Sequence, residues 1–241
     1  MDMHATNESG VLVVDKEPGM TSHDVVAIAR RSLGIKKIGH CGTLDPAATG
    51  LLMLVVGRAT KIQDLLMSED KEYVGTVTLG VKTSTQDAEG EVLEEAEVRE
   101  FSAEEIDAAF GAFTGDFEQI PPMVSAIKKD GVPLYKLARK GKEVKRDPRP
   151  VYVTSYAIDR IALPQVDFTV NCSKGFYVRT YAHDIGDKLG CGGHLSALRR
   201  TRSGKFTLDR AISVKELKGG ERSELLKAMV SLAEISLMRG A

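Results

Sequence analysis

One polar stretch of the sequence holds the side chains best suited to chemistry. Residues 39–50 read GHCGTLDPAATG, with Asp45 near the centre and His40, Thr43 and Thr49 spaced around it. Pro46 disfavours a helical backbone at Asp45, and the flanking glycines permit tight turns and the close approach of another molecule. A carboxylate presented in this way suits acid–base or nucleophilic chemistry. An Asp-Pro pair among glycines is also the composition of an ordinary turn, so both interpretations stay open.

The elements on either side must hold this loop. Directly after it, the apolar run at residues 51–56 predicts a buried strand, so the carboxylate lies on a loop braced by the core. Residues 11–14 predict a first short strand. A helix follows, which Thr21 can cap together with Asp24 and which Gly34 can end.

Composition bounds the class of protein. A chain of 241 residues with 42% hydrophobic residues can form one large domain or two small ones around a substantial core. The sequence contains no apolar run long enough to span a membrane and no signal-peptide pattern, so we expect a cytoplasmic protein. Three cysteines at irregular spacing predict reduced thiols rather than disulfides or a zinc site. Five scattered histidines lack the close spacing of a metal pair, so no metal is expected.

Charge is segregated along the chain although the formal net charge is only −1. Residues 86–107 contain ten acids and one arginine, which indicates a solvated acidic face. Residues 127–149 contain nine lysines and arginines against three acids. Local potential rather than total charge steers a polyanion, so the basic segment is compatible with nucleic-acid binding as well as with a solvated surface.

Periodicity predicts the remaining elements. Alternation over residues 73–79 predicts a strand, and a capping box at Ser102 predicts a helix over residues 103–113. Two antiparallel strands are expected on either side of Pro164, followed by a helix over residues 177–189. We also expect a helix over residues 58–67 and two short helices after Ser213.

The loop resembles the catalytic motif of the TruB family of pseudouridine synthases, the bacterial tRNA pseudouridine-55 synthases, in which the Asp of GHxGTLDPxATG is catalytic. Three more segments resemble the family: the KEY motif ending at Tyr73, the stretch QIPPMVSAIKK with the later LYKLARKG, and the FYVRTYAHDIG segment. The amino-terminal Lys16-Glu17-Pro18-Gly19 departs from the family, because its proline stands one place later. The resemblance covers nearly the whole chain, in four separated motifs.

The resemblance implies an α+β pseudouridine synthase fold: one catalytic domain over residues 1–241, with a mixed, largely antiparallel sheet flanked by helices. It implies a basic insertion at about residues 119–149 that clamps RNA, and we expect no carboxy-terminal PUA domain. The implied reaction converts uridine 55 in the T-loop of tRNA to pseudouridine with a flipped-out base, without a cofactor or metal. The T-arm and T-loop of tRNA would be the partner, the protein would not bind membranes, and a monomer is expected.

The resemblance also assigns residues. Asp45 would be the catalytic acid, either as nucleophile at ribose C1′ or as base at the C2′ proton, with Tyr73 and Arg179 beside it. Substrate binding would fall to His40, Lys16, Tyr177 and Leu198, and RNA binding to Lys128, Lys129, Lys136, Arg139, Lys140, Lys142, Arg199, Arg200 and Arg202.

Two other classes of protein remain as alternatives. A catalytically silent RNA-binding protein of the same fold would have lost the acid at position 45, and the acid is present. A glycoside or nucleoside hydrolase usually pairs two acids, whereas these motifs offer one acid and an arginine.

Overall fold

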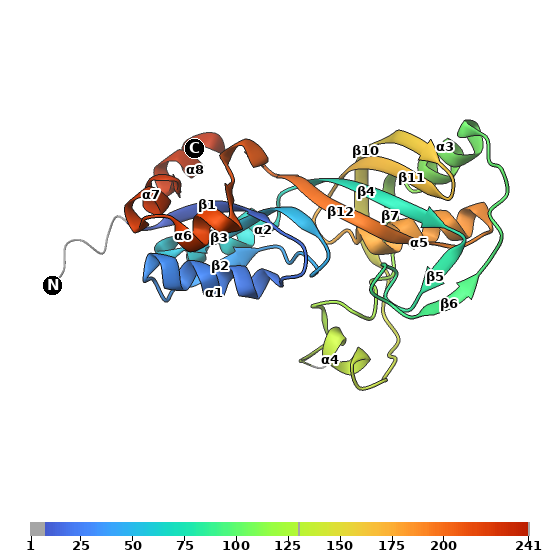
Figure 1. Ribbon diagram of the computed structural model, residues 1–241, viewed down its shortest axis with the longest axis horizontal. Helices are drawn as coiled ribbons and strands as arrows, with labels where there is room; N and C mark the ends of the chain where they lie inside the picture. The colour runs from blue at the N-terminus through green and yellow to red at the C-terminus, as the bar shows by residue number, and fades with distance from the viewer. Residues whose placement is uncertain (1–7, 130, 241) are drawn as a thin grey trace. The chain divides into compact units, whose positions relative to one another are not determined.

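The computed structural model describes residues 8–129 and 131–240 (Figure 1). The chain forms two compact units: one takes in the described residues up to Tyr73 and those from Arg199 onward, and the other is Val74–Leu198. The chain passes from one unit to the other inside two strands, β4 (Lys71–Leu79) and β12 (Gly193–Ser203). The division does not test the single catalytic domain expected from the sequence, which stays a prediction.

The sheet of the first unit is organised around β3 (Thr49–Val56). β3 pairs antiparallel with β1 (Gly10–Lys16) over seven residue pairs that run from Gly10 and Val56 to Lys16 and Gly50. Its second half also pairs antiparallel with β2 (Ile38–Cys41), whereas Thr49 and Gly50 pair in parallel with β12. Short strands complete this sheet: β13 (Phe206–Thr207) on β12, and β14 (Ile212–Ser213) and β15 (Val230–Ser231) on β1.

The first predicted helix is α1 (Ser22–Leu33), and its ends are those that the sequence indicates. Thr21 and Asp24 form a complete capping box, and Gly34 ends the helix with a φ of 65°. The helix expected over residues 58–67 is a 3-10 turn, η2 (Gly57–Ile62), continued by α2 (Gln63–Met67). The expectation of two helices after Ser213 is wrong in number, because three follow: α6 (Val214–Gly219), α7 (Arg222–Lys227) and α8 (Leu232–Met238). A short 3-10 turn, η3 (Leu208–Arg210), precedes them.

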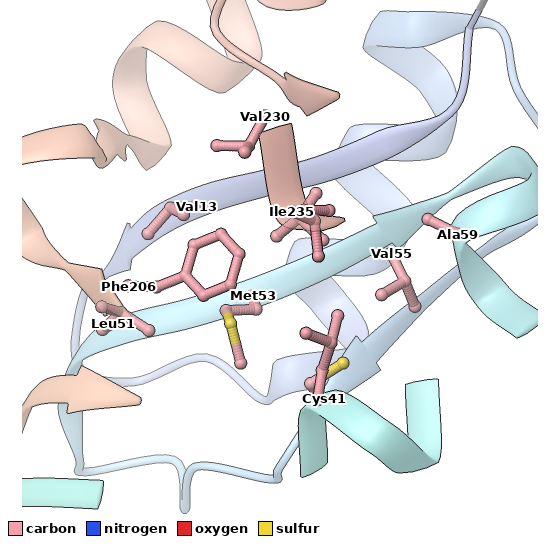
Figure 2. Packing of buried hydrophobic residues seen from close by; sticks show 11 residues of the cluster. Val13, Cys41, Leu51, Met53, Val55, Ala59, Phe206, Val230 and Ile235 are labelled. Atoms are coloured by element: carbon pink, nitrogen blue, oxygen red, sulfur yellow. The ribbon is translucent and has the colours of Figure 1, made fainter. Parts of the chain in front are cut away.

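Both faces of β3 are buried, which explains its unbroken apolar sequence. On one face, alternate residues of β1 and β3 pack with Phe206 and with Ile235 of α8, as Figure 2 shows. The helix α1 contacts β2, α6 and α7, and α6 also contacts β1. The strand β3, which follows the loop that carries Asp45, is therefore held in the core of the unit.

In the second unit, β10 (Arg149–Ala162) pairs antiparallel with β11 (Gln165–Cys172) and with β7 (Gly115–Gln119), which confirms the two strands predicted around Pro164. Helices α3 (Ala103–Gly111) and α5 (Val178–Leu189) pack on this sheet through Phe110, Phe168 and Tyr181, whose ring centroids lie 5.5–5.8 Å apart. The remaining elements are β5 (Val81–Thr83), β6 (Val92–Glu95), β8 (Lys128–Lys129), β9 (Val132–Pro133) and α4 (Leu134–Ala138). A mixed sheet flanked by helices, the predicted α+β class, is confirmed.

Candidate active site

The loop that carries Asp45 leaves the sheet where β3 changes its neighbour. β2 pairs with residues 53–56 of β3 and ends at Cys41, whereas β12 pairs with Thr49 and Gly50. Residues 42–48 connect these two pairings. Sheet hydrogen bonding therefore fixes the loop at both of its ends.

Two glycines and one buried arginine hold the ends of the loop together. Gly42 and Gly50 have φ values of 81° and 96°, and a Cβ at Gly50 would lie 2.3 Å from the carbonyl oxygen of Arg200. The Arg200 side chain donates from Nε to the Leu51 carbonyl oxygen at 2.7 Å and from Nη2 to that of Gly42 at 3.1 Å. Arg200 is 1% exposed. This position contradicts the expectation that Arg200 lies on an RNA-binding surface; it braces the loop instead.

Lys16 braces the middle of the same loop. Its Nζ donates to the carbonyl oxygens of Glu17 at 3.0 Å, Pro46 at 3.0 Å and Ala48 at 2.6 Å. A buried ammonium is tolerated only when its donors are satisfied, and three carbonyls match its three N–H groups. Because Lys16 is 1% exposed, the expected contact with substrate is corrected to a structural one. Lys16 is the last residue of β1.

Asp45 is half-buried at the start of a turn. The Ala48 N–H donates to the Asp45 carbonyl oxygen at 3.1 Å, with Pro46 at the second position of the turn. The Gly19 N–H donates to the Pro46 carbonyl oxygen at 2.9 Å. These contacts hold the backbone around Asp45, from which its side chain projects.

His40 lies in β2, shortly before the loop, and is half-buried. Burial, followed by the charges of His23 and Arg200, lowers its pKa below the usual 6.5. The ring is thus neutral at pH 7. A neutral imidazole is suited to hydrogen bonding with a nucleotide rather than to pairing with a phosphate.

Three further predicted residues lie in the parts of β4 and β12 that belong to the first unit. Tyr73 is 8% exposed in β4. Arg199 donates from both Nη atoms to the Asp15 carboxylate, at 2.9 and 2.7 Å, and Arg202 Nε lies 4.0 Å from the Glu72 carboxylate. Both arginines are partly exposed, and their RNA-binding roles stay predictions.

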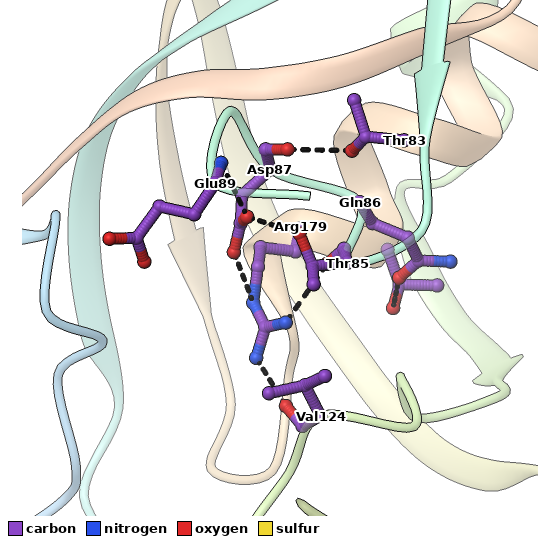
Figure 3. A network of polar contacts seen from close by, with 8 residues as sticks. Thr83, Thr85, Gln86, Asp87, Glu89, Val124 and Arg179 are labelled. Carbon is purple, nitrogen blue, oxygen red and sulfur yellow. Dashed lines mark hydrogen bonds and ion pairs between the residues drawn. The ribbon is translucent and has the colours of Figure 1, made fainter. Parts of the chain in front are cut away.

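In the second unit, Arg179 lies in a network that links α5 to two loops (Figure 3). Its Nη1 donates to the Thr85 carbonyl oxygen at 2.9 Å and its Nη2 to that of Val124 at 2.7 Å, while Nε is 3.6 Å from the Asp87 carboxylate. Asp87 also accepts hydrogen bonds from the Thr85 hydroxyl and, at 3.1 Å, from the Glu89 N–H. The arginine is 4% exposed, so its direction is fixed.

Sequence reasoning missed Asp87. It falls in TSTQDAEGEV, which predicts a polar turn at the start of the acidic segment. Turn composition indicates where the chain bends, but it does not reveal that Asp87 pairs with an arginine in a helix far along the chain. A carboxylate among many acids gave no separate signal.

Tyr177 occupies the N-cap position of α5 but makes no side-chain cap. Gln119, at the end of β7, instead binds both backbone groups of Tyr177: its Nε2 donates to the Tyr177 carbonyl oxygen at 3.0 Å, and its Oε1 accepts from the Tyr177 N–H at 2.8 Å. Gln119 is 2% exposed. Leu198, in β12, is the last residue of the second unit and is half-buried.

The basic insertion consists of a short β8–β9 hairpin and the helix α4. The Arg139 guanidinium lies 5.6 Å from the centre of the Tyr135 ring, and Lys129 Nζ donates to the Lys145 carbonyl oxygen at 2.6 Å. The backbone of Lys128 lies in β8, and its side chain is outside the described part. Within the insertion, the predicted phosphate-binding side chains that are described are all at least partly exposed: Lys129, Lys136, Arg139, Lys140 and Lys142.

Two further findings concern the described residues alone. Among them, no group of three or more His, Cys, Asp or Glu side chains is arranged to hold a metal ion. None of their helices has both the length and the apolar character needed to cross a membrane.

The fold is shared with solved structures of two complexes. A crystal structure of a Cbf5–Nop10–Gar1 complex matches 99% of this chain with a TM-score of 0.74 and 29% identity. The structure of an H/ACA RNP bound to a substrate RNA containing 2′-deoxyuridine also matches 99% of the chain, with a TM-score of 0.70 and 26% identity. The chain spans 64% of each of those chains. With this fold and loop, the chain is of the pseudouridine synthase class.

Sequence comparison narrows the class to one family. The N-terminal domain model of TruB family pseudouridylate synthases matches residues 30–178, and the model of the tRNA pseudouridylate synthase B C-terminal domain matches residues 179–237. A tRNA pseudouridine synthase B of Opitutus terrae is 55% identical over 92% of this chain and 92% of its own length. One of Geobacter sulfurreducens is 51% identical over 92% and 73%. The chain belongs to the TruB family of pseudouridylate synthases.

Proposed function

We propose that the protein isomerises uridine 55 in the T-loop of tRNA to pseudouridine, with Asp45 as the catalytic carboxylate. The reaction breaks the bond from base N1 to ribose C1′ and joins C1′ to C5. It needs a carboxylate near C1′, a pocket that holds the detached base, and a group that removes the C5 proton. The observation that carries the proposal is the TruB-type loop, in which the peptide backbone around Asp45 is held by buried side chains.

The other site residues take the roles that the family resemblance suggests. Tyr73 stacks on the uracil and takes the C5 proton, and Arg179 keeps Asp45 ionised. To these we add Asp87, which restrains Arg179 through their ion pair. His40, Tyr177 and Leu198 hold the flipped-out nucleotide. Asp45 acts either as nucleophile at C1′ or as base at the C2′ proton.

The exposed lysines and arginines of the insertion bind the phosphates of the T-arm. Such contacts are independent of sequence and sensitive to salt, so they position the RNA while the loop around Asp45 selects the uridine. The enzyme acts as a monomer in the cytoplasm, needs no cofactor, and uses the whole chain as one catalytic domain.

Tritium release from tRNA that carries uridine labelled at C5 tests the proposal. Wild-type protein should release tritium at the T-loop uridine, and Asp45→Asn should abolish release while retaining RNA binding. The matched control is Asp70→Asn, because Asp70 is an exposed acid of the same unit. Release by Asp45→Asn at the wild-type rate would refute the role of Asp45. Binding without release by the wild type would favour a catalytically silent RNA-binding protein.

Free uracil as a product would favour a third class of protein. A nucleoside hydrolase breaks the same N1–C1′ bond but passes C1′ to water, so the base leaves. Chromatography of the digested tRNA separates this outcome from isomerisation, because only isomerisation leaves the modified nucleoside in the chain.

A further inference from the structure

The hydroxyl of Ser22 holds both backbone groups of the residue that precedes Asp45. Ser22 Oγ accepts a hydrogen bond from the Leu44 N–H at 2.9 Å and donates one to the Leu44 carbonyl oxygen at 3.1 Å. Leu44 lies beyond the end of β2, where the strand pairing with β3 has stopped. The Ser22 side chain thus makes the hydrogen bonds to the Leu44 backbone that a paired strand would otherwise make.

The start of α1 does not need this hydroxyl. Thr21 and Asp24 already cap the helix reciprocally, and Ser22 is the first helical residue, a position with no special demand for serine. Ser22 is nevertheless 2% exposed, and burying a hydroxyl is unfavourable unless it is hydrogen-bonded. The two bonds to Leu44 therefore account for the serine.

Leu44 is also fixed through its side chain, which is 3% exposed in the core. Its carbonyl group belongs to the peptide plane that continues into the Asp45 nitrogen. Because a peptide unit is rigid, holding that carbonyl restricts the rotation that would swing the Asp45 side chain. The next carbonyl, that of Asp45, accepts a hydrogen bond from the Ala48 N–H, so Asp45 lies between two restrained peptides.

We propose that Ser22 is a positioning residue for catalysis, which acts by fixing the peptide that leads into Asp45. The inference rests on the proposed catalytic role of Asp45. Side chains that touch the reacting atoms need support from neighbours whose own geometry is locked, and small misplacements reduce rate strongly. Ser22 is expected to affect the chemical step and not the affinity for RNA.

Two substitutions at position 22 separate the hydroxyl from its packing. Ser22→Ala removes both hydrogen bonds and leaves a smaller side chain, whereas Ser22→Thr keeps the hydroxyl and adds a methyl group to a buried position. Ser32→Ala is the matched control, since Ser32 lies on the same helix and is half-buried. Single-turnover tritium release, RNA affinity, melting temperature and hydrogen exchange at the Leu44 amide are measured for each variant.

Ser22→Ala should lower the single-turnover rate about 10- to 100-fold, with RNA affinity unchanged within about two-fold. The Leu44 amide should exchange faster in this variant. Ser22→Thr should lower the melting temperature, because its added methyl group disturbs the packing. It should keep the rate within about three-fold of the wild type, because the retained hydroxyl still holds Leu44 and the reaction depends on the position of the Asp45 carboxylate. Ser32→Ala should change none of these.

A Ser22→Ala rate within about two-fold of the wild type would overturn the proposal, as would an unchanged Leu44 exchange rate. Equal losses of rate in Ser22→Ala and Ser22→Thr would also overturn it, because packing would then explain the effect. Failure of the proposed function is distinct: it would appear as a wild-type protein that releases no tritium, and hydrogen exchange would still show whether Ser22 restrains Leu44.

Discussion

Substitution of Gly50 by alanine tests how the Asp45 loop is attached to the sheet. Gly50 has a φ of 96°, and an added Cβ would lie 2.3 Å from the carbonyl oxygen and 2.9 Å from the nitrogen of Arg200. Both neighbours are backbone atoms of β12, so no side chain can rotate away to make room. Gly50→Ala must therefore strain its own backbone and also push β12 from β3.

The two costs can be estimated separately. A non-glycine residue in this sparsely populated region of φ costs on the order of 1–3 kcal/mol. Separation of β12 from β3 at Thr49 and Gly50 weakens backbone hydrogen bonds worth about 1 kcal/mol each. We expect a total loss of about 3–5 kcal/mol, a large fraction of the stability of an ordinary domain.

Gly34→Ala is the matched control, because Gly34 also has a positive φ, of 65°, but an added Cβ would meet nothing within 4 Å. It should lose about 1 kcal/mol, the cost of the backbone alone. Urea unfolding followed by circular dichroism measures both variants. If Gly50→Ala is no less stable than Gly34→Ala, the close approach of β12 does not hold the loop.

Two other predictions follow from charges in the second unit. Burial, together with the charge of Asp187, raises the pKa of Asp184 from 3.8 to about 6, although the charge of His183 acts to lower it. The folded protein therefore favours the protonated Asp184. This contribution to stability is fully present below pH 3.8 and is lost as the pH rises through 6. Asp184→Asn should accordingly stabilise the protein to urea by about 1 kcal/mol at pH 7.5 and by much less near pH 4; equal gains at both would contradict the assignment. Removing three insertion lysines should flatten the plot of log affinity for tRNA against log salt by about 0.7–0.9 for each phosphate that is no longer neutralised. The slope should keep its wild-type value in the control lysine variants of α6, and equal slopes in both sets would contradict phosphate binding by the insertion. The insertion lysines are Lys136, Lys140 and Lys142, and the controls are Lys215 and Lys218.

The elements predicted from sequence were those with local signals. The capping box at Thr21 and the alternation around Pro164 each involve residues close together in the chain, and the structure confirms both. The end of the chain was less predictable, because three helices of six or seven residues leave little room for periodicity.

The side chains that brace the site gave no such signal. Arg200 and Gly42 are 158 positions apart, and Gln119 and Tyr177 are 58 apart. A pattern within either segment does not reveal the other. Resemblance to a family identified Asp45 and Arg179 but did not name Ser22, Gln119 or Asp87 as the residues that hold them and their neighbours.

Two cations, Arg200 and Lys16, were wrongly expected on a surface that binds RNA or substrate. One physical cause explains both errors. A loop rich in glycine and proline lacks regular pairing, so its carbonyl groups need other donors wherever it is rooted in the core. Here the carbonyls of Gly42, Pro46 and Ala48 receive their donors from Arg200 and Lys16. Residue type could not distinguish these cations from RNA-binding ones, because both kinds carry the same charge. The hydrogen-bonding needs of the loop could have distinguished them. A motif that leaves backbone carbonyls unpaired next to a buried strand requires buried hydrogen-bond donors nearby.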